Sequence, residues 1–325
     1  MAIDAGYGDS QSGKSKALEM LAGHLFQQSG KKTRVYSSDG GQETYNDRGL
    51  VDDGVIELMD VSTRAWPMTV LKLISDFYFL KDPKDPNSKL VAPAVNLYET
   101  HGLIIYEGGT TIGNWLLSDV PGGLAWHAAT ETKFGGIKDE DGVLSTEDDL
   151  KVEGDYNLQG ANSPKHFMIA QRKIVTAVRT SKKFPGMVWW TFHPTVGPDK
   201  GGGGESGKFG AITGKKLIGP DAGGSALVST IGKEFGNLLH FDQVTLPNKK
   251  ELDETSKKTV TQVEKEFRVY TKRHYDPEAT VAIEYVAGAR ARVADYYVSK
   301  EPGDSILQFY QSVAEERKKA KEKRG

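Results

Sequence analysis

The sequence predicts an α/β fold: a mainly parallel sheet with helices on both faces and an antiparallel extension near the C-terminus. Three observations lead to this prediction. Short apolar runs of strand length alternate with stretches whose apolar residues recur at helical spacing. Several of the short runs end in a polar or charged residue. A glycine-rich motif lies between the first short run and the first helical stretch, as expected where a strand turns directly into a helix.

The individual elements follow from the same patterns, in chain order. Strands are expected at residues 2–5, 33–39, 54–58, 102–107 and 186–193, and helices at 16–28, 65–80, 164–183 and 225–239. A strand at 241–246 is expected next, then two antiparallel strands at 264–272 and 280–286, joined by a turn at 274–277. The chain is expected to end in a helix at 305–325, apolar in its first half and strongly charged in its second.

The glycine-rich motif predicts a nucleotide phosphate site. Residues 8–15 read Gly-Asp-Ser-Gln-Ser-Gly-Lys-Ser and match G-x-x-x-x-G-K-[ST] at every fixed position. The glycines let successive backbone N–H groups face the phosphates, Lys14 can reach the β and γ oxygens, and the Ser15 hydroxyl can bind Mg²⁺. The candidate cofactor-binding residues are therefore Gly8, Asp9, Ser10, Gln11, Ser12, Gly13, Lys14, Ser15 and Lys16.

Carboxylates at two strand ends are candidate partners for this phosphate site. Glu107 ends the apolar strand at 102–107, where a carboxylate faces the magnesium and its water shell in proteins with this motif. The usual residue there is Asp, so both a metal contact and a direct catalytic role stay open for Glu107. Asp39 ends a neighbouring strand and is the favoured activator of the attacking water, with Glu43 as its rival. A solvated carboxylate or a turn-forming Asp would look the same in sequence.

A third strand ends at Thr191-Phe192-His193, where a polar side chain could sense the terminal phosphate. His193 and Thr191 are both candidates, and a structural role for the histidine is an equal alternative.

Composition narrows the class of protein. The chain has 325 residues, no cysteine and a formal net charge of −2, so disulfides are excluded and any nucleic-acid contact needs a local basic patch. The absence of cysteine, of a long apolar run and of a leader-like N-terminus favours a cytoplasmic protein that does not enter a membrane. The seven histidines lack the spacing of a zinc site, so Mg²⁺ bound with nucleotide is the metal expected.

The order of these parts resembles the RecA-like ATPase core, most closely the compact RecA-like ATPases encoded by phages, including those associated with single-strand annealing. The resemblance spans roughly residues 2–293 and rests on position and chemistry more than identity. It implies ATP as cofactor, Asp39 in place of the usual water-activating glutamate and His193 in place of the usual polar sensor. It also implies that Arg290 and Arg292 reach the nucleotide of the next subunit in a homo-oligomeric ring or filament, and an ordinary pair of surface arginines is an equal alternative.

The resemblance also suggests roles for two segments that the sequence pattern marks as insertions. The glycine-rich segment 194–224 corresponds to a loop that contacts single-stranded DNA, and it carries the lysines at 200, 208, 215 and 216. A flexible surface loop is its alternative interpretation. The segment 122–162 is acidic, which favours a lid, a protein contact or a mimic of nucleic acid over phosphate binding.

The sequence thus predicts an ATPase domain at 1–300 followed by a charged helical tail at 301–325. The leading hypothesis is a Mg²⁺-dependent ATPase, phage-encoded and active in the host cytoplasm, that acts on single-stranded DNA in recombination, annealing or replication. Lys14, Asp39, Glu107, His193, Arg290 and Arg292 are its catalytic candidates, with Ser15 and Glu107 as metal ligands. A nucleotide-dependent assembly protein with incidental turnover and a small-molecule kinase remain as alternatives.

Overall fold

A computed structural model describes residues 2–39, 41–61, 99–115, 164–182, 184–197, 216–223, 227–228, 230–246, 249–253, 258–262, 264–276 and 283–323. The predicted helix at 65–80 and the acidic insertion at 122–162 lie outside these residues.

The centre of the molecule is a parallel sheet. Its strands lie in the order β3 (Ile56–Asp60), β2 (Lys32–Ser37), β4 (His101–Glu107), β5 (Met187–Phe192), β1 (Ala2–Tyr7) and β8 (Asn237–Thr245). Each neighbouring pair in this order is parallel. The carboxyl ends of β1, β2 and β4 therefore meet at one edge of the sheet, and this edge carries the predicted site.

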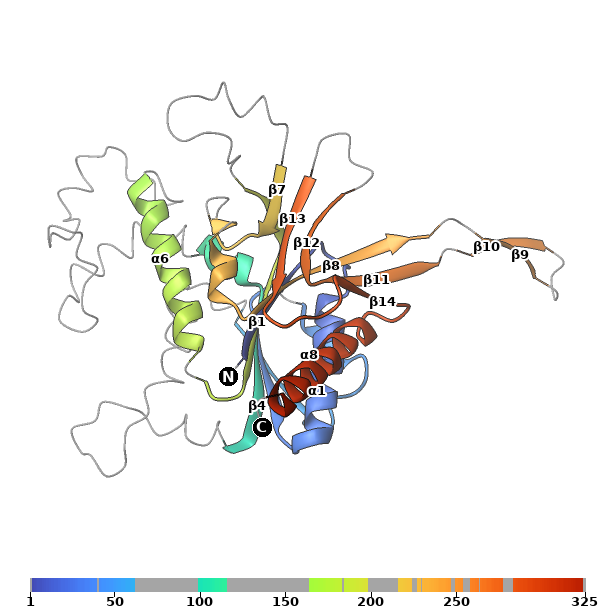
Figure 1. Cartoon of the computed structure of the whole chain (residues 1–325), viewed down its shortest axis with the longest axis horizontal. Helices are drawn as coiled ribbons and strands as arrows, with labels where there is room; N and C mark the ends of the chain where they lie inside the picture. Colours follow the sequence, from blue (N-terminus) through green and yellow to red (C-terminus); the bar gives the residue numbers. More distant parts are fainter. Residues whose placement is uncertain are drawn as a thin grey trace, which may run out of the picture.

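The central strands are apolar on both faces because helices cover both. Trp189 and Trp190 of β5 are fully buried and point to opposite faces, as successive strand residues must. Helices α1 (Lys14–Ser29) and α8 (Asp304–Glu322) pack on the Trp189 face, and α6 (Pro164–Ser181) packs on the Trp190 face (Figure 1). The α/β prediction, with helices on both faces, is confirmed.

The sheet divides at β8. Its first residues pair with the antiparallel strand β13 (Ile283–Ala289), and its later residues pair with the antiparallel strand β11 (Lys265–Tyr270). Strand β14 (Tyr296–Ser299) continues on the β11 side, while β12 (Lys272–Tyr275), β7 (Lys216–Pro220) and β6 (Pro194–Val196) continue on the β13 side. A separate two-stranded sheet of β9 (Lys249–Asp253) and β10 (Lys258–Gln262) projects beyond β8 and β11 (Figure 1). The predicted antiparallel C-terminal extension is thus confirmed.

Stacked rings fill the point where the sheet divides. Tyr7, His240 and Tyr270 are direct cross-strand neighbours on β1, β8 and β11, and His274 and Tyr285 of the β12–β13 hairpin stack on His240. Burial lowers the pKa of His240 to about 3, helped by the nearby His274 and Lys14. The ring is therefore neutral at physiological pH and serves as packing beside the phosphate site.

Two predicted elements are wrong. In the described part of the helix expected at 225–239, the chain instead forms a short 3-10 turn, η3 (Ile231–Glu234), followed by β8. Gly232 and Gly236 weaken a helix there, and pairing of Asn237–His240 with β1 provides the stronger alternative. The expected partner of the strand at 280–286 is also wrong: β13 pairs with β12, which contains His274 and Tyr275 of the supposed turn.

The C-terminal helix is part of the core, and a buried polar network attaches it. Ile306 and Phe309 of α8 are fully buried. The Tyr310 hydroxyl donates to the fully buried Asp4 carboxylate over 2.6 Å and accepts from the Trp189 indole over 2.8 Å. Asn237 donates twice to the other Asp4 oxygen, so both oxygens of this carboxylate are satisfied.

Tyr310→Phe is expected to lower the free energy of unfolding by about 2 kcal/mol, because it leaves a buried carboxylate oxygen and an indole N–H without their partner. Urea unfolding measures this. Tyr297→Phe, another hydroxyl deletion beside α8, is the matched control, since the buried Tyr297 hydroxyl makes no hydrogen bond to the part of the chain that the structure describes. An equal loss in both variants would contradict the stated role of the network.

Candidate nucleotide site

The phosphate loop, residues 8–15, joins β1 to α1 and depends on its two fixed glycines. A Cβ at Gly8 would lie 2.2 Å from the Phe241 carbonyl oxygen, so only glycine fits against β8. Gly13 has φ +85°, and a Cβ there would lie 2.7 Å from Pro302. This shape turns the chain directly into α1, whose first backbone N–H groups face the loop.

Lys14 is held across the loop. Its ammonium group donates to the carbonyl oxygens of Gly8 and Asp9 over 2.7 and 2.8 Å and to the Ser12 hydroxyl over 3.3 Å. Burial lowers the pKa of Lys14 to about 8, although the carboxylates of Asp9, Asp39 and Glu107 act to raise it. An anion in the loop would restore the charged form.

Ser15 and Glu107 form the second part of the site, here called the metal pair. The Ser15 hydroxyl donates to Glu107 Oε1 over 2.5 Å. Glu107 is 3% exposed, and burial raises the pKa of its carboxyl to about 7, with a further upward contribution from Asp39. Ser38 fastens this strand end, because its hydroxyl donates to the carbonyl oxygens of Glu107 and Gly108.

The metal pair fits a magnesium ion. Both side chains offer oxygen atoms, which Mg²⁺ prefers, and a cation would favour the charged form of the buried Glu107. The other carboxylate oxygen, Oε2, is buried and makes no hydrogen bond of normal length and angle within the described residues, although the Ser37 and Tyr45 hydroxyls approach the carboxylate. Ser15 and Glu107 would therefore hold the ion, which would neutralise phosphate charge in a bound nucleotide.

Asp39 lies beside the metal pair. A Cβ at Gly108 would come within 3.2 Å of the Asp39 carboxyl carbon. The Asp39 charge opposes the lowering of the Lys14 pKa by burial and adds to the raising of the Glu107 pKa. The Asp39 side chain is exposed, as is that of its rival Glu43 on the 3-10 helix η1 (Gly41–Asn46). The structure thus brings Asp39 to the same edge of the sheet as Lys14 and Glu107.

At the end of β5, the buried Thr191 side chain lies closer to the metal pair in the hydrogen-bond network than the side chain of the predicted His193 does. Thr191 Oγ1 accepts from the Gly108 backbone N–H over 3.1 Å, next to Glu107. The His193 backbone N–H donates to Thr110 Oγ1, and the Thr110 hydroxyl donates to the Asp221 carbonyl oxygen. Thr191 is therefore the polar side chain of β5 that contacts the backbone beside the metal pair.

Sequence reasoning did not find the loop at residues 41–48 that closes over α1. Lys16 Nζ contacts Glu19 over 2.9 Å and Asp47 over 2.8 Å, and Glu19 also accepts from the Arg48 backbone N–H. The Lys16 ammonium is thus held by carboxylates of α1 and this loop. Tyr45, fully buried in the same loop, places its hydroxyl close to Ser15 and Glu107.

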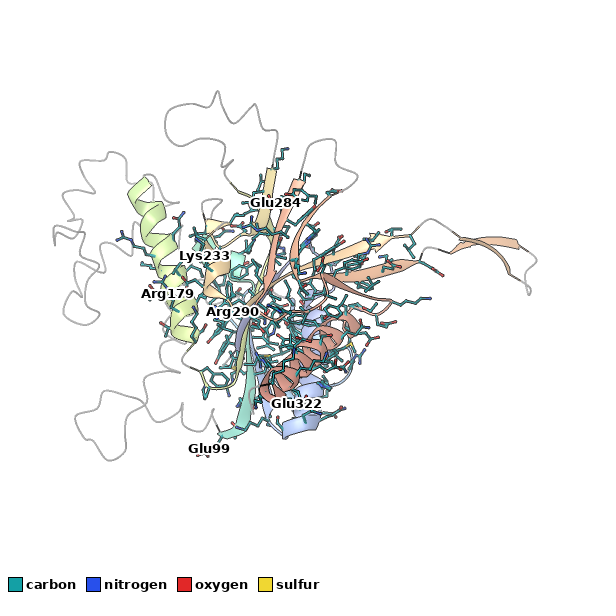
Figure 2. The ribbon with its side chains drawn as sticks, in the orientation of Figure 1. Glu99, Arg179, Lys233, Glu284, Arg290 and Glu322 are labelled. Atoms are coloured by element: carbon teal, nitrogen blue, oxygen red, sulfur yellow. The ribbon has the colours of Figure 1, made fainter. Side chains whose placement is uncertain are left out.

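The two predicted arginines lie away from the chain's own phosphate loop. The Arg290 backbone N–H donates to the Asn237 side chain, and Asn237 pairs with Asp4, near the start of β1. Both Arg290 and Arg292 are exposed, and Arg290 lies just past the end of β13 (Figure 2). Because the phosphate loop follows the opposite end of β1, these arginines do not contribute to the nucleotide site of their own chain.

The ends of the predicted insertion at 194–224 belong to the sheet. Strands β6 and β7 pair with each other, and β7 also pairs with β13. Lys216, at the start of β7, is exposed, while the lysines at 200, 208 and 215 lie outside the described residues. The glycine-rich part between these strands therefore starts and ends at fixed points of the fold.

The described residues form an α/β domain with a mainly parallel sheet, and its phosphate loop and a buried carboxylate lie at the same sheet edge. Among solved structures, the chain is similar to the flagellar accessory protein FlaH from Methanocaldococcus jannaschii, with 9% identity, a TM-score of 0.34 and coverage of 91% of this chain and 84% of that chain. No family model matches the sequence, and no curated protein matches it. No helix in the described part of the chain is long and apolar enough to span a membrane.

Proposed function

We propose that this protein binds ATP with Mg²⁺ and hydrolyses it. The observation that carries the proposal is the hydrogen bond between Ser15 of the phosphate loop and the buried Glu107. Burying a carboxyl group is costly unless a charged or hydrogen-bonding partner compensates, and a nucleotide-bound cation is such a partner. The chemistry is attack of water on the γ-phosphoryl group.

Each side chain has a role in this proposal. Lys14 neutralises charge on the transferred phosphoryl group, and Ser15 and Glu107 hold the metal. Asp39, exposed beside Gly108, orients the attacking water, and Thr191 fixes the backbone that follows Glu107. His193 remains a candidate sensor of the terminal phosphate.

Single-stranded DNA is the proposed partner. The support is a glycine-rich segment with lysines, whose ends are fixed at β6 and β7 and whose exposed Lys216 begins β7. Backbone N–H groups and lysines can follow a phosphate chain without reading its sequence.

A nucleotide-dependent homo-oligomer in which turnover is incidental is the second candidate. The position of Arg290 favours it, because this exposed arginine lies at the far edge of the sheet from its own phosphate loop. An arginine in that position can complete a site only in a neighbouring subunit.

ATP hydrolysis measured with and without single-stranded DNA, at two protein concentrations, separates these functions. Hydrolysis that DNA stimulates, and that rises per subunit with protein concentration, is the expected result. ATP-dependent assembly without turnover would favour the second candidate. Phosphoryl transfer to a small acceptor would overturn both in favour of a kinase.

A further inference from the structure

Three buried oxygen atoms beside the metal pair make no hydrogen bond of normal length and angle to the described residues, although the Ser37 and Tyr45 hydroxyls lie close enough to the Glu107 carboxylate to lower its pKa. They are Glu107 Oε2, Ser37 Oγ and the Tyr45 hydroxyl, each almost inaccessible to water. Ser37 and Glu107 are opposite each other in the parallel ladder of β2 and β4, so the first two atoms come from one sheet edge. Tyr45 comes from the other side, out of η1, with its ring in the core between α1 and the sheet.

The buried Tyr45 hydroxyl is not needed for packing and lowers the stability of the folded protein. A buried hydroxyl without a partner costs about 1–3 kcal/mol relative to one that is bonded, whereas phenylalanine would fill the same core position without that cost. The polar side chains that act on this hydroxyl are those of the metal pair and Asp39. The hydroxyl is therefore expected to gain a hydrogen-bond partner when Ser15 and Glu107 hold a cation.

We infer that Tyr45 is a positioning residue of the nucleotide site, whose hydroxyl donates to Glu107 Oε2 when Ser15 and Glu107 Oε1 turn to the metal. This inference rests on the proposed function. In the described structure, Ser15 donates its proton to Glu107 Oε1. When the Ser15 oxygen binds a cation, that hydrogen bond is lost, and a new donor to the carboxylate holds its orientation.

The same contact joins the loop at 41–48 to the metal. This loop carries Glu43, follows Asp39 directly, and is fixed to α1 by the ion pair between Lys16 and Asp47. Tyr45 is thus the link through which a filled metal pair fixes the segment that bears the water-activating candidates.

Tyr45→Phe tests the inference, with Tyr36→Phe as matched control. Tyr36 also has a buried hydroxyl, but its ring packs on the opposite face of the sheet, the face that α6 covers. The measurement is the affinity for a fluorescent ATP analogue, first in EDTA and then during titration with Mg²⁺, together with urea unfolding of each variant.

In Tyr45→Phe we expect about a tenfold loss of Mg²⁺ affinity in the presence of nucleotide, the size of one hydrogen bond to a charged group. The affinity in EDTA and the unfolding midpoint are expected to stay at or above those of the wild type. Tyr36→Phe is expected to keep the wild-type Mg²⁺ affinity.

Equal Mg²⁺ affinity in Tyr45→Phe and the wild type would overturn the inference while leaving the proposed function intact. A parallel loss of metal-free nucleotide affinity, or loss of the fold, would also overturn it, because the hydroxyl would then be structural. A wild type that binds no nucleotide at all would remove the proposed function itself.

Discussion

Lys14→Ala is expected to reduce the rate constant of ATP hydrolysis by about 100-fold or more and to weaken ATP binding by about 10- to 100-fold. The first effect is that of removing one charged donor from the transferring phosphoryl group, and the second is that of one hydrogen bond to a charged group. The variant also leaves the carbonyl oxygens of Gly8 and Asp9 without the Lys14 ammonium as donor. Steady-state hydrolysis and equilibrium binding measure the two effects separately.

Lys319→Ala provides the matched control, because this lysine is exposed on α8 and pairs only with Glu316 among the described residues. Equal activity of Lys14→Ala and Lys319→Ala would show that Lys14 makes no contribution at the phosphates.

The lowered pKa of Lys14 predicts a pH dependence of ATP binding. In EDTA, ATP affinity of the wild type is expected to fall above about pH 8, since binding must then include uptake of a proton. Lys14→Ala is expected to lack this fall.

Glu107→Gln is expected to abolish the Mg²⁺ dependence of nucleotide binding and yet to stabilise the metal-free protein above pH 7. Burial raises the folded-state pKa of Glu107 from an ordinary value of 4.5 to about 7. The unfolded chain therefore ionises this group at lower pH than the folded protein does. Its ionisation favours unfolding increasingly between those two pH values, and the full loss of about 3 kcal/mol is present above pH 7.

Urea unfolding in EDTA at pH 4 and pH 8 measures this effect in the wild type and the variant. The stability gained by Glu107→Gln is expected to be larger at pH 8 than at pH 4 by about 2 kcal/mol or more. With Mg²⁺ and nucleotide present, the order of stability is expected to reverse, because Mg²⁺ tightens nucleotide binding only in the wild type. An equal gain in the free energy of unfolding at both pH values would show that burial does not raise the pKa of Glu107.

The sequence predicted those parts of the site that local chemistry determines. Lys14 and Ser15 were predicted from the motif at residues 8–15, and Glu107 from its place at the end of an apolar run. Phosphate loops and buried parallel strands both have strong local sequence patterns. Helix α1 ends at Gly30, whose φ of +66° is the left-handed cap that glycine favours.

Features that depend on contacts between distant segments could not be predicted. Tyr45 looks like any core aromatic residue, and its position beside Glu107 arises only when η1 packs on α1. Asp4 lies in a short apolar run, and its partners Tyr310 and Asn237 are more than 200 residues away. The first residues of β8 fall at the end of the predicted helix at 225–239, because a short segment with two leucines fits both a helix and a strand. Pairing with the distant β1 makes this segment a strand.

The central claim is that the phosphate loop and Glu107 form one nucleotide and magnesium site. Calorimetric titration of ATP into the wild-type protein, in Mg²⁺ and then in EDTA, tests it most directly. The account predicts one ATP bound per chain, tighter with Mg²⁺ than in EDTA, with Glu107→Gln binding equally in both. An ATP affinity that Mg²⁺ does not change in the wild type, or no binding at millimolar ATP, would contradict it.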